Sequence, residues 1–312
     1  MKILITGATS IIAVPLIKYL LQQNHEIYAM IRPGSANAER LKGLEHGLLK
    51  IIELDLNNSD RLPQYMETDF DVCFHFGWDG AGSENRKKRE VQQKNVADSM
   101  KLLKTTAEMG CRKFLFSGSQ AEYGIYEQKI CETAPCHPVS EYGIAKVDFM
   151  HHVQEYLDSR KDISMEYVHA RIFSVYGPED HKGSLIDSCI DTFMSGGRIE
   201  LGECSQLWNF LYIDDLTAAL TALMEAEHKP GTVEVYNVAG AESDTKPLKE
   251  YIDIVYKCCG CKGEYLLGRR PPNAEGTANL NPDITKIQKK TGWTPQIAFV
   301  DGINEIIKQR SK

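Results

Sequence analysis

The first thirteen residues, MKILITGATSIIA, constrain the fold more than any other stretch of the chain. Lys2 to Thr6 is a short run of mainly apolar residues, Gly7 interrupts it, and residues 10–21 have the apolar spacing of a helix. A buried strand that turns through a glycine into a helix presents backbone N–H groups at the helix N-terminus, which favours a pyrophosphate. Ser10 and Ala13 replace the later glycines of a Gly-x-x-Gly-x-x-Gly loop, so a strand–helix corner without a ligand is the alternative for this stretch.

Strand and helix patterns alternate along the rest of the chain. Further strands are expected at residues 25–31, 49–54, 70–76, 113–117, 164–170 and 233–238. Helices are expected at 83–109, 141–157 and 216–226, with two short ones beginning near Asp283 and Phe299. This alternation predicts an α/β protein with a doubly wound parallel sheet. We predict a dinucleotide-binding domain over residues 1–170, with 209–238 folding back onto its sheet, and a smaller mixed α/β cap over 171–208 and 239–312.

Composition narrows the classes of function. The net charge of −7 argues against binding to nucleic acid or to an anionic membrane. The sequence has no signal-peptide pattern and no apolar stretch of transmembrane length, so we expect a cytoplasmic protein. Nine scattered cysteines, an odd number, are typical of a reducing compartment. Cys258 and Cys261 form a lone Cys-x-x-Cys pair without a second pair of ligands, so no metal site is expected.

The sharpest chemical signal is Tyr142-Gly-Ile-Ala-Lys146. Residues four apart face the same side of a helix, which brings the two side chains within reach of each other. An ammonium group lowers the pKa of a neighbouring phenol from about 10, and the phenol can then give or take a proton near neutral pH. An amphipathic helix with a surface lysine has the same spacing, so the motif alone does not distinguish the two interpretations.

A second group of polar residues, Ser117-Gly-Ser119-Gln-Ala-Glu-Tyr123-Gly124, follows the strand expected at 113–117. Ligands of an open parallel sheet bind at the carboxyl ends of its strands. A hydroxyl at this edge can therefore hydrogen-bond a substrate oxygen beside Tyr142. Serines after a strand are also ordinary turn residues, which is the alternative for Ser117.

With these residues identified, the chain resembles the extended short-chain dehydrogenase/reductase family, in its NAD(P)-dependent nucleotide-sugar epimerase, dehydratase and 4-ketoreductase branch. The resemblance spans nearly the whole chain and implies a Rossmann fold with a nucleotide-sugar-binding cap. It depends on the order and spacing of the following pieces: 7–13, Asp55-Leu56, His75-Phe-Gly77, Asn95-Val96, 119–124, Tyr142 with Lys146, 171–178 (RIFSVYGP), 210–215 (FLYIDD), Tyr236-Asn237-Val238 and Gly292-Trp-Thr-Pro295.

The resemblance implies a role for each matching position. Tyr142 would exchange the proton at the sugar carbinol or ketone, Lys146 would hold the nicotinamide ribose and tune Tyr142, and Ser119 takes the place of the catalytic serine or threonine. The expected cofactor-binding residues are Gly7, Thr9, Ser10, Ile11, Ile12, Arg32, Asp55, Leu56, Phe76, Gly77, Ser117, Tyr142, Lys146 and Arg171. The expected substrate-binding residues are Trp78, Ser119, Gln120, Ser174, Trp208 and Arg270. A homodimer is implied as well, formed through the helices expected at 83–109 and 141–157.

Two departures from the family pattern bear on the reaction. Ile31 stands where an NAD enzyme usually has an acid for the adenosine ribose, and Arg32 follows it. Because a guanidinium suits a 2′-phosphate, we predict NADP(H), with NAD as the alternative. Gln120 and Ala121 occupy the places where related 4,6-dehydratases have an Asp and a Glu, which argues against dehydration.

The cap departs from the family pattern at two further positions. Ser174 replaces a usual asparagine, and Trp208 replaces a usual arginine. In relatives both residues contact the diphosphate. Arg269 or Arg270 can supply the missing charge, and a solubilising loop before Pro271 is the alternative for this pair.

The first functional hypothesis is NADPH-dependent reduction of the C4 ketone of a nucleoside-diphosphate 4-keto-6-deoxysugar, a step of deoxysugar biosynthesis. The alternative is an NAD-dependent nucleotide-sugar 4-epimerase, which uses the same Tyr142 and Lys146. A non-catalytic NADP-binding sensor is the third hypothesis, and the intact set of Ser119, Tyr142 and Lys146 argues against it. The expected partners are a nucleoside-diphosphate sugar and a second copy of the chain.

Overall fold

The computed structural model describes residues 1–44, 46–82, 84–271 and 278–311 of the chain. The chain divides into two compact units, each assembled from separate stretches. The first comprises Met1–Glu122, Pro138–Arg171 and Leu220–Tyr236. The second comprises Tyr123–His137, Ile172–Ala219 and Asn237–Lys312. Residues 123–137, which the sequence assigned to the dinucleotide domain, therefore group with the second unit.

A seven-stranded sheet organises the first unit, in the order β11-β6-β5-β4-β1-β2-β3. Its strands are β1 (Lys2–Thr6), β2 (Glu26–Ile31), β3 (Leu49–Glu53), β4 (Val72–His75), β5 (Lys113–Ser119), β6 (Glu166–Ile172) and β11 (Val233–Val238). The pairs β1–β2, β1–β4, β2–β3 and β4–β5 are parallel. All seven strands lie where the sequence predicts them, and the predicted doubly wound α/β class is confirmed.

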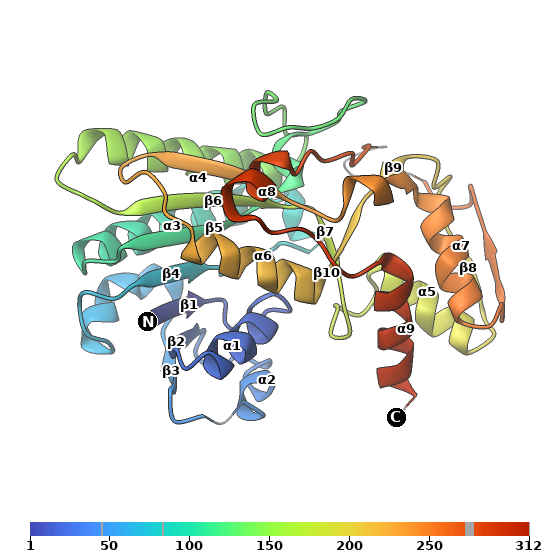
Figure 1. Cartoon of the computed structure of the whole chain (residues 1–312), viewed down its shortest axis with the longest axis horizontal. Helices are drawn as coiled ribbons and strands as arrows, with labels where there is room; N and C mark the ends of the chain where they lie inside the picture. Colours follow the sequence, from blue (N-terminus) through green and yellow to red (C-terminus); the bar gives the residue numbers. More distant parts are fainter. Residues whose placement is uncertain (45, 83, 272–277, 312) are drawn as a thin grey trace. The chain divides into compact units, whose positions relative to one another are not determined.

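Helices and helical turns connect the strands of this unit. They are α1 (Ala13–Gln22), α2 (Glu39–Lys42), η1 (Leu56–Gln64), η2 (Asn85–Lys87), α3 (Arg89–Glu108), η3 (Gln120–Glu122) and α4 (Glu141–Ser159). Helix α6 (Ile213–Glu225) begins in the second unit and ends in the first. Helices α3 and α4 lie side by side (Figure 1). Apolar side chains of both helices, including Leu103 and Phe149, join one buried cluster with the sheet residues Leu4 and Phe114.

The helix expected at 83–109 begins later than predicted. Ser83 lies outside the described residues, Asn85–Lys87 forms a separate 3-10 turn, and α3 starts at Arg89. The interruption is at Lys88, whose backbone is extended with φ −89° and ψ 101°. A short 3-10 turn and a separate α-helix therefore replace one continuous helix.

The second unit combines short strands with helices. Among its described residues, three two-stranded sheets pair β7 (Ser174–Tyr176) with β10 (Phe210–Tyr212), β9 (Leu207–Trp208) with β12 (Lys246–Pro247), and β8 (Arg198–Glu200) with β13 (Glu264–Leu266). Its helical segments are α5 (Leu185–Met194), η4 (Glu242–Asp244), α7 (Leu248–Cys258), α8 (Thr285–Thr291) and α9 (Phe299–Arg310). Aromatic rings form its centre, with Phe299 4.9 Å from Tyr176 and 4.6 Å from Tyr251 between ring centroids.

Candidate active site

The turn after β1 forms a backbone cradle at the start of α1. Gly7 has φ +63°, and a Cβ there would lie 2.6 Å from the backbone nitrogen of Gly77. Within the described residues, the N–H groups of Ile11 and Ile12 have no protein acceptor. The hydroxyl of Ser10 accepts from the N–H of Ala13 at 3.2 Å, so it extends the cap of the helix. Free N–H groups at a helix N-terminus behind a close glycine turn fit the pyrophosphate of a dinucleotide.

The order of the sheet changes direction between β1 and β4, which makes this edge the expected ligand crevice. His75 joins the strands beneath it. Its Nδ1 lies 2.7 Å from the hydroxyl of Thr6, and its Nε2 lies 2.8 Å from the hydroxyl of Ser99. Ser117 donates from its hydroxyl to the carbonyl of His75 at 3.1 Å. Burial lowers the pKa of His75 to about 3, so the ring is neutral at pH 7.

Lys146 is a buried cation at the carboxyl end of β5, with 1% of its surface exposed. Its Nζ donates to the carbonyl of Ser117 at 2.8 Å. The same Nζ lies 3.8 Å from the centroid of the Trp78 ring and 4.3 Å from that of Phe116. Burial lowers the pKa of Lys146 well below its ordinary value; the field of the Glu122 carboxylate opposes that shift, and the nearby guanidinium of Arg86 adds to it. The aromatic faces favour the charged form that burial disfavours.

Tyr142 stands in the first turn of α4. The hydroxyl of Ser140 caps this helix by accepting from the N–H of Gly143 at 3.2 Å. Gly143 leaves room for the backbone carbonyl of Ala121, which a Cβ would strike. The start of α4 therefore lies directly against the corner that follows β5. Lys146 Nζ is 5.5 Å from the centroid of the Tyr142 ring, as the four-residue spacing predicts.

Ser119 ends β5 at the same edge of the sheet. Its hydroxyl donates to the side-chain carbonyl of Gln120 at 2.7 Å and accepts from the N–H of Ala121 at 3.2 Å. The structure thus brings Ser119, Tyr142 and Lys146 to the carboxyl ends of the strands, on elements that contact one another. Their catalytic roles stay predictions.

A buried carboxylate supports this corner. Glu122 is 0% exposed, and it accepts from the N–H of Ser119 at 2.8 Å. Nε2 of His169 lies 2.9 Å from it, and Nε of Arg171 donates to it at 2.7 Å. Burial alone raises the pKa of Glu122, but His169 and Arg171 outweigh that effect and lower it to about 2. Burial also lowers the pKa of His169.

Arg171 was expected to bind the cofactor. Its side chain is 2% exposed and ion-pairs with Glu122, and it lies beneath the corner of the sheet. Contact between Arg171 and a cofactor stays a prediction.

Two guanidinium groups lie near the turn after β1 and the end of β2. Arg32 follows β2 and lies 3.7 Å from Asp79, with both side chains exposed. Arg40 in α2 donates to the carbonyl of Thr9 at 3.1 Å, which holds it against the turn after β1. Asp55 caps η1 by accepting from the N–H of Asn57 at 3.4 Å. Leu56 packs toward Gly77, where a Cβ would lie 2.9 Å from its Cδ1 atom.

The remaining expected substrate ligands belong to the second unit. Ser174 begins β7 and pairs with Phe210, and Trp208 in β9 pairs with Lys246. Within the described residues, the indole N–H of Trp208 is buried and has no hydrogen-bond partner. Arg270 has an exposed side chain, and its backbone N–H donates to the carbonyl of Leu201 at 3.1 Å. Contact of these residues with a substrate stays a prediction.

Four residues around the site were missed in the sequence: Arg40, Arg86, Gln92 and Glu122. Each acts through a partner 31 or more residues away or through the loop after β4. Local periodicity does not carry such information. The Glu in the segment 119–124 was visible, but only the fold shows that its carboxylate is buried.

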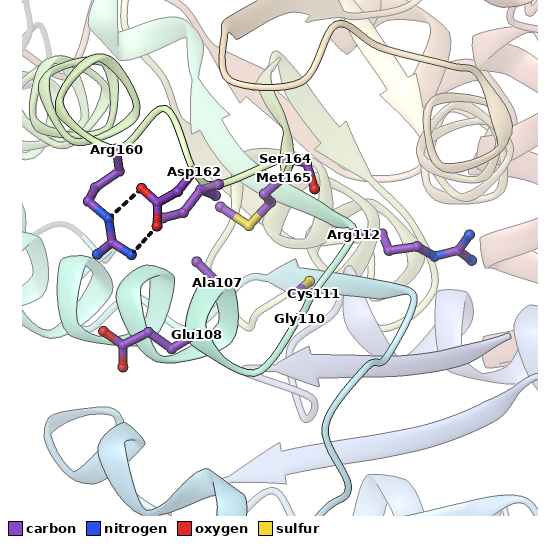
Figure 2. Close-up of a pocket in the computed structure, with 10 residues that line it drawn as sticks. Ala107, Glu108, Gly110, Cys111, Arg112, Arg160, Asp162, Ser164 and Met165 are labelled. Atoms are coloured by element: carbon purple, nitrogen blue, oxygen red, sulfur yellow. Dashed lines mark hydrogen bonds and ion pairs between the residues drawn. The ribbon is translucent and has the colours of Figure 1, made fainter.

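A cavity of about 440 Å³ lies at the opposite edge of the sheet. Cys111 and Arg112 precede β5, and Ser164 and Met165 precede β6, so these lining residues mark the amino ends of the strands. Figure 2 shows Arg160 turned toward Asp162 beside this cavity, with bonds of 2.8 and 2.9 Å. The cavity is thus separate from the edge that holds Tyr142.

The residues that the structure describes contain no group of three or more His, Cys, Asp and Glu side chains arranged to hold a metal ion. None of the helices in this part of the chain is long and apolar enough to cross a membrane.

Comparisons with known proteins relate the chain to one family. The model of the NAD dependent epimerase/dehydratase family matches residues 3–239. The chain is 24% identical to the UDP-glucose 4-epimerase of Mycolicibacterium smegmatis over 323 residues, which cover 99% of this chain and 98% of that protein. It is 26% identical to the dTDP-4-dehydro-6-deoxyglucose reductase of Escherichia coli over 220 residues, which cover 69% of this chain and 66% of that protein.

A solved structure has the same fold. The UDP-glucuronic acid 4-epimerase of Bacillus cereus in complex with NAD superposes with a TM-score of 0.82 and 23% identity, over 99% of this chain and 97% of that one. The chain therefore belongs to the NAD dependent epimerase/dehydratase family, the extended short-chain dehydrogenase/reductases, whose members are NAD(P)-dependent oxidoreductases or epimerases acting on nucleotide sugars.

Proposed function

We propose that the protein catalyses 4-epimerisation of a nucleoside-diphosphate sugar, with Tyr142 as the acid–base residue. The observation that carries the proposal is the placement of Tyr142 against the corner after β5, with the buried ammonium of Lys146 5.5 Å from its ring. The M. smegmatis relative that aligns over 99% of this chain is a 4-epimerase, which favours this reaction.

Three side chains, those of Tyr142, Lys146 and Ser119, would have separate roles in this reaction. The phenolate of Tyr142 would take the proton of the C4 hydroxyl as C4 loses a hydride and becomes a ketone. After the ketosugar has rotated in the site and C4 has regained the hydride on its other face, the phenol of Tyr142 would return the proton to the C4 oxygen. Lys146 holds a positive charge beside that phenol, which stabilises its anion. The hydroxyl of Ser119, which now donates to Gln120, turns to the sugar oxygen and orients it. The nicotinamide, when bound, accepts and returns the hydride of C4.

A second candidate, net reduction of a 4-ketosugar with NADPH, is favoured by one specific observation. Arg32 and Arg40 stand at the adenosine end of the cradle, and the end of β2 has isoleucine where an NAD enzyme usually has an acid. Guanidinium groups in this place suit a 2′-phosphate. A reductase must exchange its cofactor at every turnover, and NADPH is the form that such an enzyme consumes.

One experiment separates the two candidates. Purified protein is incubated with UDP-glucose, and separately with dTDP-4-dehydro-6-deoxyglucose and NADPH, while sugars are separated by chromatography and NADPH is followed by absorbance. Epimerisation interconverts two nucleotide sugars without net consumption of cofactor, whereas reduction consumes one NADPH for each hydroxysugar formed. Tyr142→Phe abolishes either activity, and Tyr156→Phe on the same helix serves as the matched control. Full activity of Tyr142→Phe would contradict both candidates.

A further inference from the structure

An arginine lies on the face of the tyrosine that carries the proposed chemistry. The guanidinium carbon of Arg86, in η2, is 4.1 Å from the centroid of the Tyr142 ring. The indole of Trp78 meets the same ring edge-on at 6.4 Å. Tyr142 is 9% exposed, so this contact is with a largely buried ring.

The loop that carries Arg86 is held by a buried amide. Gln92 in α3 is 0% exposed, and its Nε2 donates to the carbonyls of Gly80 at 3.1 Å and Asn85 at 2.9 Å. Its Oε1 accepts from the indole N–H of Trp78 at 2.8 Å. One side chain thus ties both ends of the segment between Trp78 and η2 to α3.

Backbone geometry in the loop fixes Arg86 further. Gly80 has φ +69°, and a Cβ there would lie 2.6 Å from Cβ of Asn85. Nη1 of Arg86 donates to the carbonyl of Ala81 at 3.2 Å. The guanidinium is held over the Tyr142 ring by a hydrogen bond to its own loop, which restricts the rotamers that a long side chain otherwise samples.

The charged groups around Tyr142 come from three elements. Arg86 reaches it from η2, and Lys146 reaches it from its own helix. Glu122, in the η3 corner packed against α4, is engaged by His169 and Arg171. Two cations thus face a ring that becomes anionic when the phenol loses its proton, and both favour the anion over the neutral phenol.

We infer that Arg86 is a positioning residue of the active site that, together with Lys146, stabilises the deprotonated form of Tyr142 and so sets the pH range of the reaction. The inference rests on the proposed role of Tyr142 as the acid–base residue. It adds a second cation, from the loop after β4, to the tyrosine–lysine pair.

The test is a titration of the phenol in the protein without substrate. Tyrosinate absorbance near 295 nm is followed against pH in the unchanged protein and in Tyr142→Phe, and the difference isolates Tyr142. The same comparison is repeated in proteins that also carry Arg86→Gln, with and without Tyr142→Phe. We expect Arg86→Gln to move the Tyr142 transition upward by roughly one pH unit, Arg86→Lys to restore most of the shift, and Arg89→Gln, at the exposed start of α3, to leave it in place.

The outcomes are distinguishable from those of the proposed function. An unchanged Tyr142 transition in folded Arg86→Gln overturns the inference, and so does an Arg86→Lys variant that titrates like Arg86→Gln. Should Arg86→Gln fail to fold, Arg86→Lys and Arg86→Met are compared instead, and equal transitions in these two overturn the inference. Absence of sugar turnover in the unchanged protein refutes the proposed function. It does not change the result of the titration, which tests only the effect of Arg86 on Tyr142.

Discussion

The carboxylate of Glu122 accepts the backbone N–H of Ser119 at 2.8 Å while both residues are buried. Donor and acceptor are three positions apart in the sequence, so a side chain of the corner after β5 closes that corner. Arg171 and His169 on β6 hold the carboxylate from the other side. The position of the Ser119 backbone at the candidate active site therefore depends on a buried charge.

Replacing Glu122 by Gln is expected to lower stability by about 3–5 kcal/mol, because the neutral amide leaves the buried guanidinium of Arg171 without its counter-charge. Urea unfolding measures this loss. Glu39→Gln, which breaks an exposed pair with Lys42, is the matched control and should change stability little. Equal midpoints for the two variants would show that the buried charge is dispensable.

Replacing Gly7 by Ala should weaken binding of the nicotinamide cofactor and lower thermal stability. The added methyl group combines an unfavourable φ of +63° with a contact 2.6 Å from the nitrogen of Gly77. Gly34→Ala separates the two effects, because Gly34 has φ +68° and nothing within 4 Å of its Cβ position. Both variants should lose roughly 1 kcal/mol from backbone strain. A Gly7→Ala variant that loses no more stability than Gly34→Ala would argue against a close contact between residue 7 and Gly77.

Arg32 and Arg40 should determine the choice of cofactor. Arg32→Ala and Arg40→Ala are each expected to raise the dissociation constant for NADPH about tenfold or more, the cost of one lost charge-assisted hydrogen bond, with little effect on NADH. Isothermal titration calorimetry with each cofactor measures the ratio of the two dissociation constants. Arg61→Ala, in η1, is the control for a change in net charge. If the substitutions weaken the binding of NADH and of NADPH equally, neither arginine recognises a 2′-phosphate.

Stability should fall as the pH drops below about 6.5, because His75 is held neutral in the folded protein. Its folded pKa of about 3 is depressed by burial, so the unfolded chain binds the proton first. The contribution of His75 to the free energy of unfolding is full above pH 6.5, and it shrinks by about 2 kcal/mol between pH 6.5 and 5. His75→Asn should flatten this dependence in urea unfolding, while His152→Asn, at an exposed position, should not.

The strands of the first unit could be predicted because most are short runs rich in apolar and β-branched residues. Residues Lys2–Thr6 and Val233–Val238 were predicted with the bounds that the structure has. Helices α5 and α7 were missed although their signal was present. In α7 the buried residues Leu248, Tyr251, Ile252 and Val255 follow the spacing of an amphipathic helix.

The supports of the site could not be predicted in the same way. Arg86 and Tyr142 are 56 residues apart in the sequence, and Glu122 and Arg171 are 49 apart. Sheet order and the turn at Gly80 bring such pairs together, and neither is encoded in local periodicity. Tyr142 and Lys146 were identifiable because one helical turn joins them.

The position of β11 has a consequence for how the protein is made. Residues Val233–Val238 form the strand beside β6, whereas the other six strands of the sheet end by Ile172. During synthesis, more than sixty further residues must leave the ribosome before that neighbour exists. Until then the nascent sheet carries an unpaired edge at β6, a template for pairing with other chains, so chaperone protection matters most in this interval of translation.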